Sequence, residues 1–269
     1  MNNLEANKIL NYVVDSNRES ISDIEVFEEI QSTNSYLMNA SSPSLKKMCI
    51  AVTTNQTAGR GRYGKSWYSP SGTGLCLSAA YTFSKKPSNL AALTLAIGVS
   101  IAEALHELKI SNIELKWPND LVIQNSKLGG ILTEIQHEDS KIISVVTGIG
   151  LNINFPNKFV FGIDKDWAQK AIDLKSVCNK LPCNNRLVGT FANYLLKTFN
   201  EFEASGFEVF SNRWSQRDWL FGRKIKVNTK NKQYLGTGAG IANDGCLLID
   251  TVDLGICRLA TGTIIEAEA

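Results

Sequence analysis

The stretch IELKWPNDLVIQNSKLGGILTEI at residues 113–135 decides the fold of this chain, because it combines strand patterns with polar turn residues. Its apolar and β-branched residues fall in three runs of strand length, at 113–117, 121–124 and 127–135. A Pro-Asn-Asp turn at 118–120 separates the first two runs, and Asn125-Ser126 separates the last two. The stretch therefore predicts neighbouring strands that pair as hairpins.

The turns of this stretch carry residues that suit ligand binding. Asn119 and Asp120 face outward from the proline turn, where an amide and a carboxylate oxygen can hold Mg²⁺. Lys127 begins the return strand, and hairpin pairing would bring its ammonium close to Asp120. Gly129 and Gly130 let a ligand lie against bare backbone. Taken alone, a plain turn residue at Asp120 and a solvated charge at Lys127 are the favoured interpretations.

Further elements are expected on both sides of this stretch. Strands are expected at 24–30, 49–53 and 75–83, with a strand pair over 141–155 in which Gly148 and Gly150 mark close backbone approach. Helices are expected at 4–14, 36–40, 90–108, 167–178 and 185–205. After residue 222, short alternating runs at 224–227, 234–238, 246–249 and 257–259 predict a small β-barrel as a second domain.

The composition is that of an ordinary soluble globular protein. The chain has 269 residues, 43% of them hydrophobic, and a formal net charge of +2. A chain of this length folds without metals or disulfides, and two domains are expected. Its first residues do not read as a signal peptide, and the apolar stretch at 90–105 is too short and interrupted to span a bilayer.

The six cysteines are scattered without a Cys-x-x-Cys pair, and the chain has two histidines, so no zinc site is expected. Buried, reduced thiols in a cytoplasmic protein are the favoured interpretation, and a Cys178–Cys183 pair is left open.

The small net charge hides a segregated distribution. From Ile30 through Ala102 the chain has no Asp or Glu, while seven cations are present: Lys46, Lys47, Arg60, Arg62, Lys65, Lys85 and Lys86. That window carries +7, so the remaining residues sum to −5. A basic region of this kind attracts an anion, whether phosphate, carboxylate or nucleic acid.

Three of these cations lie in a glycine-rich run, GRGRYGK at 59–65, within a segment at 54–74 expected to lack secondary structure. The run satisfies G-x-G-x-x-G, but no helix opens after it and the next acid is Glu103, which excludes a dinucleotide-binding fold. No P-loop motif occurs either. The two guanidiniums match carboxylate or phosphate oxygens. Without a nearby acid the loop is expected to be mobile when empty and to close as a lid over an anion. A solvated basic loop is the alternative, and Trp67 reads either as a base-stacking ring or as a core anchor.

Five blocks resemble, in order, the signatures of bacterial biotin protein ligases. They are QSTN at 31–34, QTAGRGR at 56–62, KWPND at 116–120, KLGGI at 127–131 and GIGLNIN at 148–154. The resemblance continues more loosely over nearly all of the chain after about residue 24. It implies an α+β fold, with a mixed β-sheet flanked by helices and related to class II aminoacyl-tRNA synthetases. The implied division is an N-terminal extension at 1–23, a catalytic domain at 24–220 and a small Src-homology-like β-barrel at 221–269.

The resemblance also implies the reaction and the residues that perform it. Biotin and ATP, with Mg²⁺, would give biotinyl-5′-adenylate and pyrophosphate, and the biotinyl group would pass to a lysine of the biotin carboxyl carrier protein of acetyl-CoA carboxylase. Because both first reactants are anions, the implied catalytic residues are cations: Lys127, Arg60 and Arg62. These three would also bind biotin, together with Ser32, Thr33, Asn34, Gln56, Gly61, Gly129 and Gly130. ATP would be bound by Arg62, Trp67, Lys116, Asn119 and Asn152, and the metal by Asp120.

Two departures from the family limit what is carried over. Members that also repress biotin synthesis have an N-terminal winged helix-turn-helix, whereas about 20 residues precede the first strand expected here, so no DNA-binding or repressor role is expected. In some relatives the barrel contributes a late arginine near the nucleotide. This chain has no arginine after Arg258, and its end at 264–269 is acidic, so the part played by the barrel is left open. Related ligases dimerise edge to edge, which implies a homodimer as one assembly.

Two other functions were weighed against this one. A lipoate–protein ligase has the same adenylate chemistry, but the blocks at 56–62 and 116–120 favour biotin. A nucleic-acid-binding module would interleave aromatic residues with the basic ones on an exposed sheet. Here the basic residues gather in one glycine loop with few aromatic residues, so neither a nucleic-acid nor a membrane partner is expected.

Overall fold

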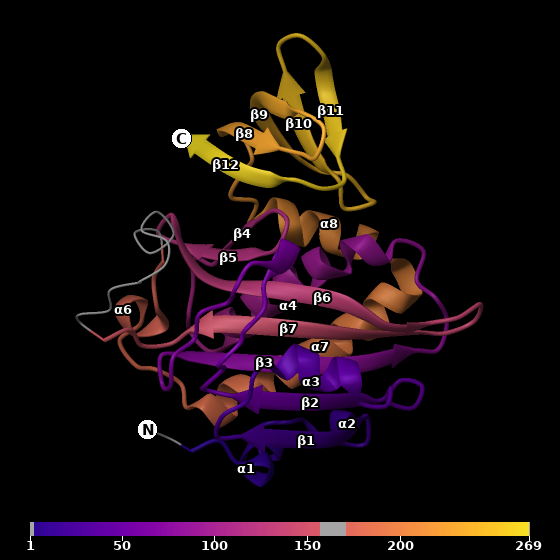
Figure 1. The fold of residues 1–269 in the computed structure, drawn as a ribbon, viewed down its shortest axis with the longest axis vertical. Coiled ribbons are helices and arrows are strands. Elements are labelled where there is room, and N and C mark those ends of the chain that lie inside the picture. The colour runs from indigo at the N-terminus through magenta and orange to yellow at the C-terminus, as the bar shows by residue number, and fades with distance from the viewer. Residues whose placement is uncertain (1–2, 157–170, 269) are drawn as a thin grey trace.

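The computed structural model describes residues 3–156 and 171–268, which form two β-sheets with helices around the larger one (Figure 1). The larger sheet has seven strands in the order β1-β2-β3-β7-β6-β5-β4. They are β1 Ile21–Phe27, β2 Met48–Thr53, β3 Gly74–Phe83, β4 Glu114–Lys116, β5 Asp120–Ile123, β6 Ser126–Glu138 and β7 Ile143–Asn152. β1 and β2 pair in parallel, and all other neighbours pair antiparallel. The sheet is therefore mixed, and the predicted α+β class is confirmed.

Helices cover both faces of the larger sheet (Figure 1). They are α1 Ala6–Leu10, α2 Asp15–Arg18, α3 Thr33–Asn39, α4 Leu93–Glu107, α6 Leu174–Val177, α7 Asn184–Ser205 and α8 Glu208–Ser215, with 3₁₀ turns η1 Arg62–Gly64 and η2 Leu90–Ala92. α3 lies on one face, over β2 and β3, while α4 and α7 lie on the other.

The alternation of side chains along β3 explains this division. Leu75, Leu77, Ala79, Tyr81 and Phe83 are buried in the main core on the α4 and α7 side, where Tyr81 stacks on Phe199 with ring centres 4.4 Å apart. The intervening residues are smaller: Cys76, Ser78, Ala80 and Thr82. Successive residues of a strand point to opposite faces, so the face beneath α3 keeps room for a ligand.

The smaller sheet follows α8 and packs over the β4 and β5 side of the larger one (Figure 1). Its strands are β8 Lys224–Asn228, β9 Gln233–Ile241, β10 Leu247–Thr251, β11 Gly255–Leu259 and β12 Thr263–Glu268. They are ordered β11-β10-β9-β8-β12, all antiparallel. Among the described residues no pairing joins β11 to β12, so the predicted barrel is an open sheet and that prediction is corrected.

The segment between the two sheets is hydrogen-bonded to the larger one. The N–H of Leu115 in β4 donates to the carbonyl of Arg217 at 2.7 Å, and the N–H of Trp219 donates to the carbonyl of Leu115 at 3.0 Å. The indole of Trp117 donates to the carbonyl of Gly245 in the smaller sheet at 3.1 Å. These bonds fix the smaller sheet beside the turn at 118–120.

Several expected elements differ from the observed ones. The helix expected at 4–14 is only the short α1, and α2 follows it as a separate helix that was not predicted. The strand pair expected at 141–155 is the single strand β7, which pairs with both β3 and β6. The helix expected at 36–40 begins earlier, at Thr33, because the hydroxyl of Ser32 accepts a hydrogen bond from the N–H of Ser35 and caps it. Of the helix expected at 167–178, residues 167–170 lie outside the described residues and only α6 is helical beyond them. Neither α8 nor β12 was expected.

The apolar helix and the cysteines have plain structural roles. The expectation that the apolar stretch at 90–105 is too short to span a bilayer is corrected, because the segment 90–107 is long and apolar enough by length and composition. However, 67% of it is buried inside the molecule. It packs beside α7 on the same face of the larger sheet and belongs to the main core. All six cysteines are free thiols, and no Cys178–Cys183 bond is present. The expectation that they are buried holds for Cys76 and is wrong for the other five, which are partly exposed.

Candidate functional site

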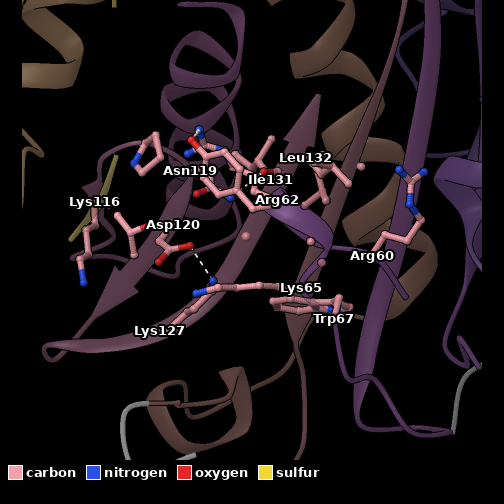
Figure 2. Close-up of a pocket in the computed structure, with 18 of the residues that line it drawn as sticks. Arg60, Arg62, Lys65, Trp67, Lys116, Asn119, Asp120, Lys127, Ile131 and Leu132 are labelled. Carbon is pink, nitrogen blue, oxygen red and sulfur yellow. Dashed lines mark hydrogen bonds and ion pairs between the residues drawn. The ribbon is translucent and has the colours of Figure 1, made fainter. Parts of the chain in front are cut away.

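The floor of the candidate site is one face of three neighbouring strands, β3, β7 and β6. Two rows of mostly small residues cross these strands, Ser78–Gly148–Leu132 and Cys76–Gly150–Gly130. A cavity of about 1020 Å³ lies over them, walled by α3, the glycine-rich loop, the β4–β5 turn and β12 (Figure 2). This volume is at the upper end of the range for small-molecule sites, so the cavity can hold a ligand of drug size or larger.

Gly148 and Gly150 are required because side chains from other elements lie directly on them. A Cβ at Gly148 would be 2.2 Å from Oδ1 of Asn34, and a Cβ at Gly150 would be 2.4 Å from Cε2 of Trp67. The predicted close approach at both glycines is therefore confirmed. The ring of Trp67 also lies 3.5 Å from the Cβ position of Gly130, so it forms part of the cavity floor.

One end of the cavity is a buried network of uncharged polar groups. The N–H of Thr33 donates to Oε1 of Gln56 at 2.8 Å, and the Thr33 hydroxyl lies 2.7 Å from that of Ser78. Ser78 donates to Oδ1 of Asn34 at 2.6 Å. Ser32, Thr33 and Asn34 are each less than 5% exposed, and all line the cavity with Gln56. The structure brings these four predicted residues together at one end of the cavity.

The other end of the cavity is charged. The ammonium of Lys127 lies 2.6 Å from Oδ1 of Asp120, each side chain about a quarter exposed. The β5–β6 hairpin places them, since Val122 pairs with Lys127 and Asp120 pairs with Gly130. The proximity expected from the hairpin is confirmed. Lys65 extends from the glycine-rich loop toward this pair, as Figure 2 shows.

The glycine-rich loop has more internal structure than expected. The N–H of Gly61 donates to the carbonyl of Lys65 at 2.7 Å, and the N–H of Trp67 donates to the carbonyl of Gly59 at 2.9 Å, so the loop folds back on itself through η1. The expectation of a segment without secondary structure is therefore wrong.

The two arginines of the loop have different surroundings. The Arg60 guanidinium forms two hydrogen bonds to the carboxylate of Glu134, at 3.1 and 2.7 Å. Arg62 lies over the ring of Tyr63, and no carboxylate within residues 3–156 and 171–268 pairs with it. The premise that no acid neutralises the loop is wrong for Arg60, because folding brings β6 to it.

The basic window of the sequence is dispersed in the fold. Lys46 pairs with Glu203 at 3.5 Å, and Lys86 pairs with Glu138, both away from the cavity. Of the seven cations, Arg60, Arg62 and Lys65 line the cavity. Within the window, the cations that can attract an anion into the cavity are therefore those of the glycine-rich loop. Lys116 and Lys127, which lie outside the window, also line the cavity.

Two of the predicted site residues, Asn152 and Gly129, do not line the cavity. The side-chain amide of Asn152 donates to the carbonyls of Lys127 and Ile172, at 3.2 and 3.0 Å, so it anchors the strand that carries Lys127. Gly129 faces Leu121 and the backbone of Gly150.

Asn119 lines the cavity, but its side-chain amide donates to the carbonyl of Ile131 at 2.9 Å. Its nitrogen therefore holds the β4–β5 turn against β6.

Sequence reasoning missed a cluster where the smaller sheet meets the site. The ring of Trp219 lies between Lys116 and Arg223, with its centre 5.0 and 4.5 Å from the two cationic groups. Its indole N–H donates to Oδ1 of Asn125 at 2.9 Å. All four line the cavity, as does β12 at 263–267. The sequence signal that could have found this cluster is Arg223, an arginine at the start of the predicted C-terminal domain.

A covalent route through a thiolate and a multidentate metal site find no support in the geometry. Cys76 lines the cavity, but burial raises the pKa of its thiol to about 11, so it is protonated at neutral pH. Within the described part of the chain, no three His, Cys, Asp or Glu side chains are grouped to hold a metal ion. Asp120 is a single carboxylate, which suits a Mg²⁺ ion whose other ligands are phosphate oxygens and water.

Comparisons with known proteins agree with this geometry. The model of the biotin/lipoate A/B protein ligase family matches residues 26–152. The bifunctional ligase/repressor BirA of Escherichia coli K12 is 31% identical over 227 residues, covering 84% of this chain and 69% of BirA. The biotin–[acetyl-CoA-carboxylase] ligase of Mycobacterium tuberculosis is 26% identical over 233 residues, covering 84% and 83%. The biotin protein ligase of Aquifex aeolicus, solved with biotin and ATP, superposes with a TM-score of 0.72 at 27% identity, covering 90% and 97%.

Proposed function

Because the chain belongs to the biotin/lipoate A/B protein ligase family, we propose that it is a biotin protein ligase that activates biotin with ATP and transfers it to a lysine of a biotin carboxyl carrier protein of acetyl-CoA carboxylase. The observation that most strongly supports this proposal is one cavity with an uncharged polar end at α3 and a cationic end at Lys127. Biotin has the same polarity, with a neutral ureido ring at one end and a carboxylate at the other. The cavity and the substrate are therefore complementary end to end.

The ring end of biotin is assigned to the network around α3. A ureido group has one carbonyl acceptor and two N–H donors, and Ser32, Thr33, Asn34 and Gln56 offer hydroxyl and amide groups for both. These residues are already fixed by hydrogen bonds: Thr33 to Gln56, Asn34 to Ser78, and Ser32 to the N–H of Ser35. Little ordering is therefore needed when the ring binds. Gly61 and Gly130 leave room for the chain of the substrate along the loop and the floor.

The reacting end is assigned to Lys127 and Arg62. A biotin carboxylate oxygen attacks the α-phosphorus, the bond from that phosphorus to the bridging oxygen breaks, and pyrophosphate leaves. Negative charge gathers around the phosphorus, and fixed cations stabilise it. Asp120 holds the Lys127 ammonium in place, and Asn152 holds the backbone of the same residue.

The transfer step uses the same cavity. The amine of the acceptor lysine attacks the acyl carbon of the adenylate, AMP leaves with the bonding electrons, and the amine loses a proton. AMP leaves as an anion, so the cations that favour adenylation also stabilise this leaving group.

The nucleotide is assigned to the side of the cavity nearer the smaller sheet. Lys116 and Asn119 line the cavity there, Trp67 offers its ring from the floor, and Asn152 anchors the strand that carries Lys127. Arg223 joins this group as a cation at the base of the smaller sheet. Since ATP supplies the energy, we place the reaction in the cytoplasm.

We propose that Asp120 contributes one ligand to a Mg²⁺ ion that arrives with ATP, and this ion would supply further charge neutralisation at the phosphates. Asp120→Asn should raise the Mg²⁺ concentration needed for half-maximal adenylation about tenfold, because a carboxylate becomes a neutral amide. Mn²⁺ binding, followed by electron paramagnetic resonance with a non-hydrolysable ATP analogue present, measures the site directly. Glu266→Gln, which changes another cavity carboxylate, is the matched control. Equal Mn²⁺ affinity in Asp120→Asn and the parent protein would remove Asp120 from the metal site.

The proposed function is tested on the acceptor. An unmodified biotin carboxyl carrier domain, incubated with this protein, biotin, ATP and Mg²⁺, should gain one biotinyl group on one lysine, as read by intact-mass spectrometry. Omission of ATP should abolish the gain. An acceptor that stays unmodified while the protein forms adenylate would show that this carrier is not its partner.

A further inference from the structure

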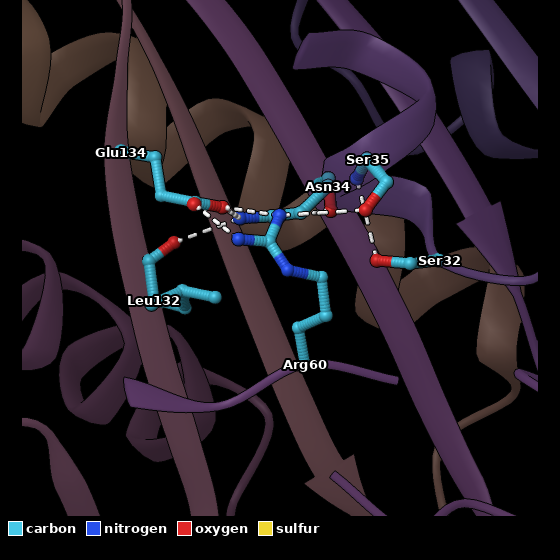
Figure 3. Close-up of polar contacts among 7 residues, drawn as sticks. Ser32, Asn34, Ser35, Arg60, Leu132 and Glu134 are labelled. Carbon is cyan, nitrogen blue, oxygen red and sulfur yellow. Dashed lines mark hydrogen bonds and ion pairs between the residues drawn. The ribbon is translucent and has the colours of Figure 1, made fainter. Parts of the chain in front are cut away.

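Glu134, on the β6 floor of the site, contacts two of the cavity walls, the glycine-rich loop and α3. It lies on β6, and its side chain is 20% exposed. Its Oε1 accepts from Arg60 of the glycine-rich loop at 2.7 Å, and its Oε2 accepts from Arg60 at 3.1 Å and from the amide of Asn34 at 3.0 Å (Figure 3). Arg60 also donates to the hydroxyl of Ser35 in α3, at 3.3 Å. The loop, α3 and β6 are thereby joined at one point.

The geometry of the Arg60–Glu134 pair suits a contact that holds the loop in one position. Two parallel N–H···O bonds between a guanidinium and a carboxylate fix direction as well as distance. The Arg60 side chain is 45% exposed, so the pair is accessible to water and its bonds can break and re-form at modest cost. Asn34, in contrast, is buried and also held by Ser78 and by the carbonyl of Leu132 at 3.2 Å. β6 and α3 are therefore held together by buried contacts. The loop is attached to them through the exposed Arg60 side chain and can detach.

The position of the pair separates it from the chemistry. Figure 2 shows Arg60 turned away from the group formed by Lys127, Asp120 and Trp67. Its charge is paired with Glu134 at the α3 end of the cavity, so Arg62 and Lys65 are the cations that the loop itself offers to a substrate carboxylate. Neutralising Arg60 thus removes the charge that would draw biotin in the reversed orientation.

We propose that the Arg60–Glu134 pair is a latch that holds the glycine-rich loop across the biotin-ring end of the cavity. Glu134 is a positioning residue, acting through Arg60 and Asn34, and Arg60 fastens the loop rather than contacting the biotin carboxylate. The inference rests on the proposed function, since it names what the loop closes over. The latch sets how long biotin and its adenylate remain bound.

The test compares biotin dissociation rates in a double-mutant cycle of Arg60→Gln, Glu134→Gln and the combined variant. Each single variant should release biotin about tenfold faster, because breaking one partner of a charge pair acts mainly on dissociation. The combined variant should be no faster than the faster single one, because the same contact is lost only once. KM for ATP should stay within about twofold in all three variants while KM for biotin rises, since the latch lies at the biotin end alone.

Gln136→Ala is the matched control. Gln136 lies two residues along the same face of β6, and its side chain donates to the carbonyls of Leu37 and Ala40 at the other end of α3, without touching the loop. It should leave biotin release unchanged. If Glu134→Gln fails to fold, as judged by circular dichroism, Arg60→Gln alone carries the test, because its side chain is on the loop surface.

The outcomes separate this proposal from the proposed function. Dissociation rates within twofold of the parent in both single variants, or rates that multiply in the combined variant, overturn the latch. A parent protein that binds no biotin at all overturns the proposed function instead. A larger change in KM for ATP than for biotin would also overturn the latch, because it would place the pair at the nucleotide end.

Discussion

Replacing Lys127 with alanine is expected to slow formation of biotinyl-adenylate by about a thousandfold, the upper range for loss of one preorganised charge at a reacting centre. In the fold, Lys127 is the cavity cation whose position is fixed from two directions: by Asp120 through its ammonium and by Asn152 through its carbonyl. An ammonium held in this way costs no reorganisation when charge develops at phosphorus. Water that fills the space of the missing side chain is a poorer substitute, because it must reorient.

The measurement is single-turnover adenylate formation, with enzyme in excess over biotin, followed by quenching and quantification of the adenylate. Lys197→Ala is the control, since Lys197 is an exposed lysine paired with Glu201 on α7, far from the cavity. Lys127→Ala should keep its melting temperature within a few degrees, because the side chain lies at the cavity and Asp120 stays partly solvated. Near-normal turnover in a folded Lys127→Ala protein would remove Lys127 from the reacting centre.

Gly148→Ala is expected to weaken biotin binding about a hundredfold, although it adds only one methyl group. The new Cβ would lie 2.2 Å from Oδ1 and 2.9 Å from Cγ of Asn34, so Asn34 must leave its place on the strand. It would then lose its bonds to Ser78, Leu132 and Glu134. Biotin would then lose its hydrogen bonds to the displaced groups, and two such bonds at about 1.4 kcal/mol each correspond to roughly a hundredfold change in affinity.

Isothermal titration with biotin measures this change. Gly98→Ala is the matched control: it is the same substitution, but in α4, where the added Cβ meets its neighbours at ordinary distances of 3.5–3.8 Å. That control should bind biotin normally. Unchanged biotin affinity in Gly148→Ala would mean that the contact of Asn34 with β7 does not shape the biotin site.

The parts of the site that sequence predicted are those that local pairing determines. The distance between Asp120 and Lys127 follows from a hairpin with a short turn, and both residues lie within the printed stretch at 113–135. The close approach at Gly148 and Gly150 could be predicted because glycine within a strand often marks a place where another group lies against the backbone.

The parts that sequence could not predict depend on elements distant along the chain. Arg60 and Glu134 are 74 residues apart, and only the order of strands in the sheet brings them together. For the same reason the acid-free window is not acid-free in space, and the loop inside it is neutralised in part. Trp219 and Arg223 were missed because they belong to the segment that joins the two sheets, and neither hydrophobic period nor turn chemistry places such a segment against a cavity.

The C-terminal sheet illustrates a further limit. Alternating apolar residues predicted four of its strands, but alternation states only that a strand has two different faces. Whether the edges meet depends on the register of β12, which pairs with β8 through an irregularity at Ile264 to Glu266 and leaves the sheet open. That same strand lines the cavity, so the acidic end of the chain belongs to the site.

The most direct test of the biotin assignment is exchange of labelled pyrophosphate into ATP, because it reads adenylate formation without any acceptor protein. A cavity polar at the ring end and cationic at the carboxylate end predicts exchange that depends on biotin and is absent with lipoate, whose ring carries no ureido group to pair with Thr33, Asn34 and Gln56. Exchange with lipoate but not with biotin would contradict the assignment.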